Sequence, residues 1–137
     1  MRPEEPLPSG IVEYALPGNW QVFAGRTDAA NDYLSFNLAQ PSDFWLHIRG
    51  MPGSHVILRV PEDHAPDRKT LECAASIAAF HSKARGAGTV SVSCTEARFV
   101  SKPTGAKPGT VVIRKERTLK VRPITEAALA GMRRDPA

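Results

Sequence analysis

The chain has 137 residues, of which 42% are hydrophobic and 23% charged, and a formal net charge of +4. These values are typical of one globular domain with its own core, and no apolar run approaches the roughly 20 residues of a membrane-spanning helix. Cys73 and Cys94 lie in apolar stretches without a CxxC spacing. They predict buried free thiols, no structural zinc and a reducing, cytoplasmic environment. The net charge favours an anionic partner, and no membrane partner is expected because no long apolar run is present.

The N-terminal part begins with a segment that predicts disorder. Residues 1–10 carry three prolines and two glutamates and are expected to be a disordered lead-in. Residues 11–16 and 20–24 then predict two short strands of a hairpin with a Pro-Gly-Asn turn between them. A helix is expected over 28–39, capped by Thr27 or the residue after it.

Residues 43–60 predict the central hairpin of the domain. Apolar residues at even positions alternate with mostly polar residues at odd positions on both sides of a Gly-Met-Pro-Gly turn. This parity places the even-numbered apolar side chains on the core face of both strands. The opposite face carries Asp43, Trp45, His47, Arg49, His55 and Arg59. We expect that face, including the Trp45 indole, to be at least partly open to a ligand.

The second half of the chain opens with a helix expected over 68–85, with Asp67 as its N-cap and two glycines at its end. Its alanine-rich body predicts close packing on a sheet. Residues 90–95 alternate as a strand, and residues 97–101 are expected to continue the same sheet past an irregularity.

The remaining elements are short. Residues 102–109 contain two prolines and two glycines, which excludes regular structure, and 111–113 and 119–121 predict strands. We expect one domain over 11–124 and a C-terminal tail over 125–137 with a short helix. Strands and helices mix without strict βαβ alternation, which predicts the α+β class, with a largely antiparallel sheet and two main helices packed on it.

Positive charge is concentrated near the C-terminus. The segment from Arg98 to Arg122 holds eight cations and one acid, so its net charge is +7 and that of the remaining chain is −3. Such asymmetry favours phosphate backbones, although a solvated strand face explains it equally well. Within this segment, Lys102 and Lys107 flank a loop that suits either a bound phosphate or a plain structural turn.

The polar face of the central hairpin fits four readings. Trp45 and the two histidines could stack on RNA bases while Arg49 and Arg59 hold phosphates. The same histidines with Asp43 could bind a divalent metal, or act as a general acid and base in a nuclease. The fourth reading is a structural network in which Asp43 orients His47 and Trp45 covers the core.

These segments resemble the NFACT RNA-binding domain, found in large ribosome-associated quality-control proteins and in stand-alone forms. The resemblance extends over about residues 20–123. The matching positions are Gly25-Arg26, Asn31-Asp32-Tyr33-Leu34, Asp43-Phe44-Trp45-Leu46-His47, Pro52-Gly53-Ser54-His55-Val56, Lys102-Pro103, Gly105-Ala106-Lys107-Pro108-Gly109, Thr118, Val121 and Pro123.

The resemblance implies a non-catalytic, cytoplasmic RNA-binding module without a cofactor or metal, acting on tRNA or ribosomal RNA in translation. Its candidate RNA contacts are Arg26, Asn31, Asp32, Asp43, Trp45, His47, Arg49, His55, Arg59, Lys102, Lys107, Arg114, Lys115 and Arg117. Charge alone does not separate RNA from DNA. The alternatives are a small hydrolase that uses Asp43, His47 and His55, and a module that docks on the ribosome or on a quality-control factor.

Overall fold

The computed structural model describes residues 7–134, and the fold is built on one large antiparallel sheet. Seven strands run in the order β8-β5-β3-β4-β2-β1-β9, and β6 pairs with β7 in a separate ribbon. Every strand pairing within the described residues is antiparallel. The predicted α+β class with a largely antiparallel sheet is therefore confirmed.

The element bounds are close to those expected from sequence at most positions. The strands are β1 Ile11–Leu16, β2 Trp20–Gly25, β3 Phe44–Ile48, β4 Val56–Leu58, β5 Val90–Glu96, β6 Val100–Ser101, β7 Val112–Ile113, β8 Arg117–Val121 and β9 Arg133–Arg134. The helices are α1 Asp28–Tyr33, the π-helix η1 Leu34–Leu38, α2 Arg68–Phe80, the 3₁₀ turn η2 Ala97–Phe99 and α3 Glu126–Ala130. No helix in the described part of the chain is long and apolar enough to cross a membrane.

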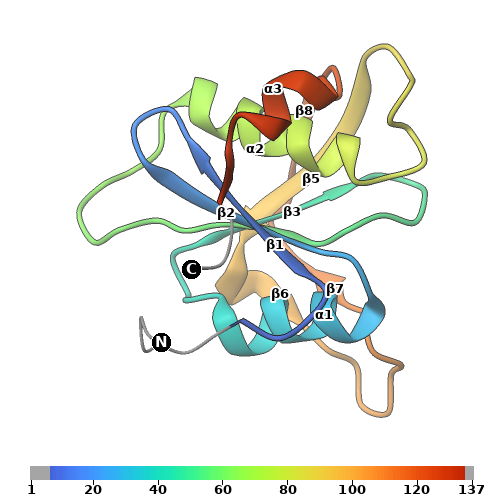
Figure 1. The fold of residues 1–137 in the computed structure, drawn as a ribbon. Helices are drawn as coiled ribbons and strands as arrows, with labels where there is room; N and C mark the ends of the chain where they lie inside the picture. The colour runs from blue at the N-terminus through green and yellow to red at the C-terminus, as the bar shows by residue number, and fades with distance from the viewer. Residues whose placement is uncertain (1–6, 135–137) are drawn as a thin grey trace.

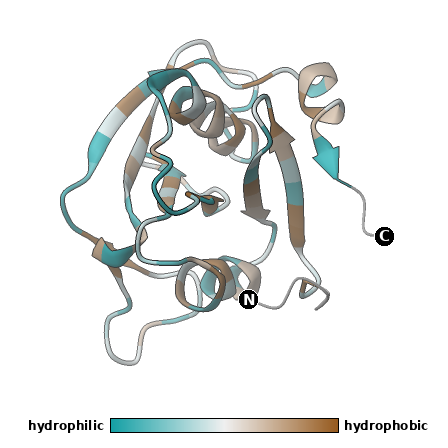
Figure 2. Ribbon diagram, turned by 90° about the vertical axis from the view of Figure 1, so that its left-hand side faces the viewer, coloured by the Kyte–Doolittle hydropathy of each residue, from teal (hydrophilic) through white to brown (hydrophobic). Residues whose placement is uncertain are grey.

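Helices cover both faces of the sheet. In Figure 1, α2 and α3 lie above the sheet and α1 lies below it. The larger core forms between the sheet and α2 and includes Leu46, Leu58 and Ile77. A second core forms on the α1 side; its buried members are Phe23, Leu34, Leu38, Trp45, Ile57 and Val100. Figure 2 shows the same layering from the side, with apolar strands between the helices.

The register of the central strands explains why two cores are needed. Leu46 pairs with Val56 and Phe44 with Leu58, so the even-numbered side chains enter the larger core, as predicted. Trp45 pairs with Ile57, and both enter the second core. The predicted parity is correct, but neither face of the β3–β4 pair is open to solvent.

Helix α2 ends five residues earlier than predicted. Asp67 caps its start, because its Oδ1 accepts a hydrogen bond from the Thr70 amide at 2.8 Å. At the other end, the backbone of His81 leaves the helical region, and Ser82 forms an isolated β-bridge with Gly53. Because the chain leaves the helix here, residues 81–82 can hydrogen-bond to the β3–β4 turn. A helix that continued to residue 85 could not form this pairing.

Three further segments differ from expectation. The helix predicted over 28–39 is capped by Thr27 but changes from α1 to the π-helix η1 after Tyr33. Residues 97–101 do not continue the large sheet, because the η2 turn diverts the chain into the β6–β7 ribbon. The segment after residue 124 forms the predicted short helix, α3, but then continues into β9, which was not predicted and which pairs with β1.

The predicted lead-in falls partly outside the described residues, which exclude 1–6 and 135–137. Within the described part, Leu7 packs against the second core, and the Gly10 carbonyl accepts a hydrogen bond from the Arg26 amide at 2.7 Å.

Candidate nucleic-acid interface

Trp45 is buried, so the prediction of an exposed indole is wrong. Only 3% of the residue is exposed, because α1 and η1 cover this face of β3. Its Nε1–H donates to Ser35 Oγ at 3.1 Å, which satisfies the only polar atom of the ring. In this conformation no nucleic-acid base can reach the indole.

Asp43 is also buried, and its contacts are structural. Its residue exposure is 0%, and its two carboxylate oxygens accept hydrogen bonds from the backbone amides of Gln40 and Val60, each at 2.8 Å. Arg59 Nη1 lies 3.4 Å from the same carboxylate, and Arg59 Nη2 donates to the Leu38 carbonyl. Asp43 therefore joins the end of η1 to strands β3 and β4, and Arg59 is occupied as its counter-ion.

The two histidines of the hairpin lie side by side behind Trp45. The ring of His55 is edge-on to both Trp45 and His47, with centroids 5.1 and 5.5 Å away. Nδ1 of His55 lies 2.9 Å from Ser35 Oγ and 3.4 Å from Trp45 Nε1. The Ser35 hydroxyl therefore joins the indole and the imidazole in one buried hydrogen-bond network.

Burial decides the charge of these histidines. Desolvation lowers the pKa of His55 to about 4, with a further lowering by the neighbouring His47. Desolvation also lowers the pKa of His47. His55 is therefore neutral at pH 7 and is held by its neighbours, which leaves it poorly placed to accept a proton from a substrate.

Asn31 and Asp32 organise the chain around this network. Asn31 Oδ1 accepts a hydrogen bond from the His55 amide at 3.0 Å. Asp32 accepts from Lys102 Nζ at 2.8 Å and from the Gly109 amide at 3.3 Å. The hydrogen bond and charge of Lys102 lower the pKa of Asp32, so the carboxylate stays ionised and fixes the 102–109 loop.

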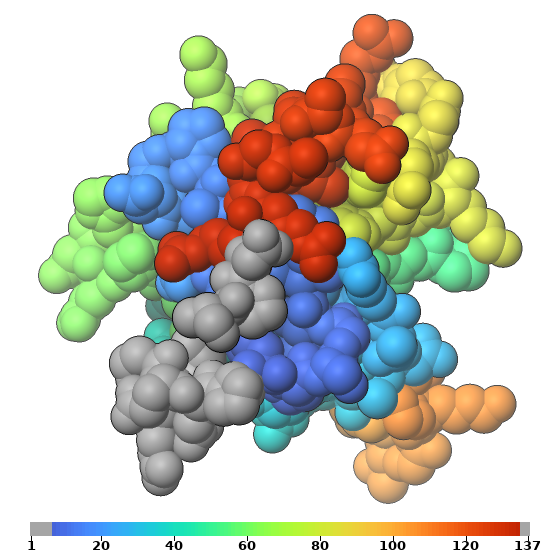
Figure 3. All heavy atoms as spheres, in the orientation of Figure 1, coloured from blue at the N-terminus to red at the C-terminus, as the bar shows by residue number. Residues whose placement is uncertain are grey.

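The 102–109 loop, orange in Figure 3, projects from the body of the molecule. Amides of this segment already donate within the protein: Ala106 to the Pro103 carbonyl, Gly109 to Asp32, and Thr110 to the Lys107 carbonyl. These bonds support the structural-turn reading of the loop. Lys107 is exposed, whereas Lys102 is committed to Asp32.

Gly25 shows how tightly this network is built, and it provides a stability prediction. A Cβ at Gly25 would lie 2.2 Å from Asn31 Oδ1 and 3.0 Å from the Asn31 amide nitrogen. We expect Gly25→Ala to displace Asn31, break its bond to His55, and lower the free energy of unfolding by about 1–3 kcal/mol. Gly86→Ala is the matched control, since nothing lies within 4 Å of a Cβ there. Urea unfolding of both variants checks this, and equal stabilities would contradict it.

The exposed cations gather elsewhere, around Phe99. The guanidinium groups of Arg98 and Arg114 and the ammonium of Lys115 lie 5.0, 5.4 and 5.2 Å from the centroid of its ring. All three cations are exposed, and Phe99 is half-buried among them. Cations held over one ring concentrate positive charge on a small surface, where a phosphate backbone can bind.

Strand β8, at the edge of the sheet, carries further exposed cations. Arg117 lies over the Phe44 ring at 5.4 Å, and Lys120 and Arg122 follow it, all exposed. We call the six exposed cations the cationic strip. Its members are Arg98, Arg114, Lys115, Arg117, Lys120 and Arg122. Arg49 lies next to the strip, where Nη1 donates to Thr118 Oγ1 at 2.9 Å.

The structure therefore divides the predicted contact residues into two groups. Residues that are buried or committed to internal partners are Asn31, Asp32, Asp43, Trp45, His47, His55, Arg59 and Lys102. Residues that remain exposed are Arg26, Arg49, Lys107, Arg114, Lys115 and Arg117. Within residues 7–134, no three His, Cys, Asp or Glu side chains come together in a way that could hold a metal ion.

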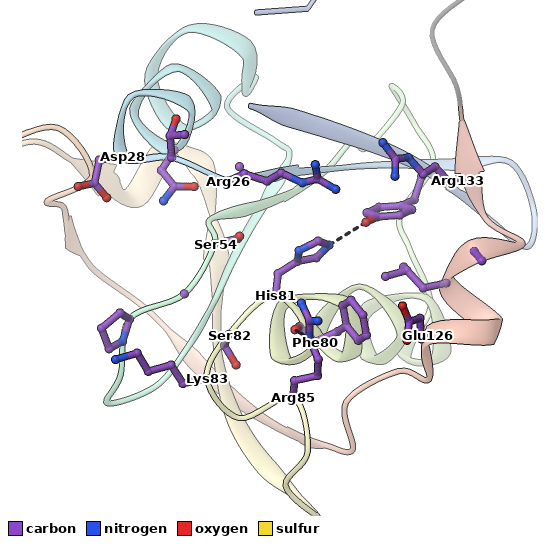
Figure 4. Close-up of a pocket in the computed structure, with 18 residues that line it drawn as sticks. Arg26, Asp28, Ser54, Phe80, His81, Ser82, Lys83, Arg85, Glu126 and Arg133 are labelled. Atoms are coloured by element: carbon purple, nitrogen blue, oxygen red, sulfur yellow. Dashed lines mark hydrogen bonds between the residues drawn. The ribbon is translucent and has the colours of Figure 1, made fainter. Parts of the chain in front are cut away.

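Sequence reasoning missed a second charged region. A cavity of about 850 Å³ lies between the end of α2, the β3–β4 turn, the start of α1 and the α3–β9 segment. It brings Arg26 together with His81, Lys83 and Arg85 (Figure 4). Arg26 is far from the other three in sequence, and residues 81–85 were predicted only as the end of a helix. The only sequence signal was the local run of His, Lys and Arg at 81–85.

The fold and its surface define an α+β domain with a cationic sheet edge. A model of the NFACT protein RNA binding domain family matches residues 12–115, which is most of the chain. The chain belongs to this family, as the sequence motifs predicted.

Two curated proteins and one solved structure are similar to the chain. It is 36% identical over 128 residues to the Rqc2 homolog RqcH of Bacillus subtilis (strain 168) and 39% identical over 119 residues to that of Streptococcus suis (strain 05ZYH33). These matches cover 93% and 87% of this chain. The chain spans about a fifth of the length of both relatives, 21% in each case. The solved C-terminal structure of the fibronectin/fibrinogen-binding protein from Streptococcus suis superposes with a TM-score of 0.84 at 33% identity, covering 96% of this chain and 54% of that one.

Proposed function

We propose that this domain is a non-catalytic RNA-binding module of ribosome-associated quality control that holds tRNA or ribosomal RNA by its phosphates. The carrying observation is the cluster of Arg98, Arg114 and Lys115 on Phe99, which continues into β8. The family description supports RNA as the ligand, and the relatives named as Rqc2 homologs support the ribosomal setting.

The hydrolase alternative has less support. Its three candidate groups would be Asp43, His47 and His55. Asp43 is fully buried with both oxygens hydrogen-bonded, and His55 is 4% exposed. A general base must reach the proton that it removes, and these groups contact other protein atoms instead. The exposed cations, in contrast, are placed for binding without chemistry.

A salt titration tests the proposal. Each phosphate neutralised adds about −0.7 to −0.9 to the slope of log affinity against log salt concentration. We expect Arg114→Gln/Arg117→Gln to weaken RNA binding and to flatten this slope by about 1.4–1.8. Fluorescence anisotropy with a labelled tRNA at several salt concentrations measures both quantities.

The matched control removes the same charge outside the strip. Lys69→Gln/Arg134→Gln takes two positive charges from exposed residues of α2 and β9. We expect this variant to keep the slope of the unmodified protein. Equal slopes for the strip variant and the unmodified protein would contradict binding through the strip. A DNA of the same sequence, measured in parallel, reports whether the ribose 2′-hydroxyl contributes.

A further inference from the structure

The cavity beside α2 collects four positively charged side chains from three separate segments. Arg26 follows β2, Lys83 and Arg85 follow α2, and Arg133 belongs to β9. Two acids, Asp28 and Glu126, also line it, so the formal charge of its lining is +2 with His81 neutral. Figure 3 shows the C-terminal segment, red, packed against the first hairpin, blue, on this side of the molecule.

Three of these cations are not neutralised within the protein. Among the described residues, no carboxylate oxygen lies within 4.0 Å of the side-chain nitrogens of Arg26, Lys83 or Arg85. Elsewhere the protein does pair its cations, for example Lys102 with Asp32 and Arg59 with Asp43. Although Asp28 and Glu126 line the same cavity, neither forms an ion pair with these three cations, so the like charges still repel each other and an anionic ligand reduces that cost.

Arg85 is held in position before any ligand binds. Its Nε donates to the Phe80 carbonyl at 2.9 Å, and its guanidinium carbon lies 4.0 Å from the centroid of the Phe80 ring. The planar guanidinium presents its remaining N–H groups as a fork that fits phosphate oxygens. Because the side chain is already ordered, binding loses little rotamer entropy.

His81 lines the cavity, and the positive charges of the neighbouring arginines affect its pKa. In Figure 4 it lies between Arg26 and Arg133 on one side and Arg85 on the other. Burial first, and then the charges of Arg26, Arg85 and Arg133, lower its pKa to about 4. Its Nε2 is 2.7 Å from Tyr14 Oη. A bound dianion would offset the arginine charges, and His81 would then gain a proton more readily.

The lining also offers apolar contacts. Phe80, Leu129 and Pro52 line the cavity, whose volume is within the range of about 300–1,000 Å³ typical of small-molecule sites. We propose that the cavity binds a phosphate monoester carried on a nucleoside, either free or at the end of an RNA chain. The binding of a free nucleotide is inferred from the cavity alone. The binding of an RNA end also rests on the proposed RNA-binding function.

Calorimetry on the full chain tests this proposal, with adenosine 5′-monophosphate as the probe and adenosine as the ligand without a phosphate. We expect the monophosphate to bind and adenosine to bind at least about tenfold more weakly, because a charge-assisted contact is lost. Arg85→Gln and Lys83→Gln should each weaken monophosphate binding by at least about threefold. Both residues are exposed, and Lys83→Gln leaves intact the packing of Arg85 on Phe80, so a change in binding in that variant does not come from the core.

Lys69→Gln on α2 removes an exposed positive charge outside both the cavity and the strip; it is the control and should leave monophosphate binding unchanged. An independent readout is the pKa of His81 by NMR, which should rise when the monophosphate binds. Equal affinities for the two probes, no binding of the monophosphate, or unaltered binding by both cavity variants would each overturn the proposal.

Two short RNAs that differ only in a 5′-phosphate or a 5′-hydroxyl identify the source of the ligand. Tighter binding of the phosphorylated RNA that is lost in Arg85→Gln assigns the cavity to an RNA end. Equal binding of the two RNAs, together with monophosphate binding, assigns it to a free nucleotide. Loss of RNA affinity in Arg114→Gln/Arg117→Gln with intact monophosphate binding would show that the strip and the cavity act independently.

Discussion

Trp45→Ala should destabilise the domain by about 3–5 kcal/mol, the usual cost of removing a large aromatic side chain from a core. The ring is 3% exposed and fills the second core with Leu34, Leu38 and Ile57. Its loss also removes the N–H that donates to Ser35 Oγ. Urea unfolding followed by circular dichroism measures the loss as a lower midpoint.

The same variant separates a structural role from RNA stacking. Under conditions where Trp45→Ala is still folded, we expect its RNA affinity to match that of the unmodified protein. Phe99→Ala is the counterpart, because Phe99 is half-buried among the cations of the strip. It should weaken RNA binding with a small change in stability. A stable Trp45→Ala protein that no longer binds RNA would restore the stacking role.

The second large effect is a loss of stability in mild acid. His55 and His81 have folded-state pKa values of about 4, whereas the unfolded value is 6.5. As the pH falls below about 6.5, the unfolded chain takes up protons that the folded chain does not, so stability decreases. The loss is complete only below about pH 4, where both states are protonated, and amounts to roughly 2–3 kcal/mol for each histidine.

Equilibrium unfolding in urea between about pH 7 and about pH 4.5 measures this dependence. His81→Gln is the informative variant, because glutamine can still hydrogen-bond Tyr14 but does not titrate. It should remove the part of the loss due to His81 and leave the parts due to His55 and His47, whose pKa values are also lowered by desolvation. If the urea midpoint of the unmodified protein did not change with pH, this would contradict the conclusion that His55 and His81 are neutral and desolvated in the folded state.

The sequence specified the parity of the central hairpin because a β-strand alternates strictly between two faces. Leu46 and Trp45 were therefore assigned correctly to opposite faces. The burial of Trp45 was not predictable from that pattern, since period-2 alternation reports only one core. What covers Trp45 is η1, which approaches from residues 34–38, and no local signal places that segment over β3.

The end of α2 shows a similar limit. The Asp67 cap could be read from sequence because capping is local, but the exit at His81 depends on pairing between Ser82 and Gly53. The strip was found as a charge run, whereas the cavity joins Arg26, Arg85 and Arg133 from three distant segments. A site assembled by tertiary contacts shows only one of its parts in any single stretch of sequence, here residues 81–85.

Photocrosslinking of the full chain to RNA, followed by mass spectrometry of the crosslinked peptides, tests the central claim most directly. We expect crosslinked nucleotides on peptides that contain Phe99 and residues 114–120, and we expect these crosslinks to disappear in Arg114→Gln/Arg117→Gln. Crosslinks concentrated on the β3 peptide that contains Trp45, and unaffected by the strip variant, would contradict an interface formed by the cationic strip.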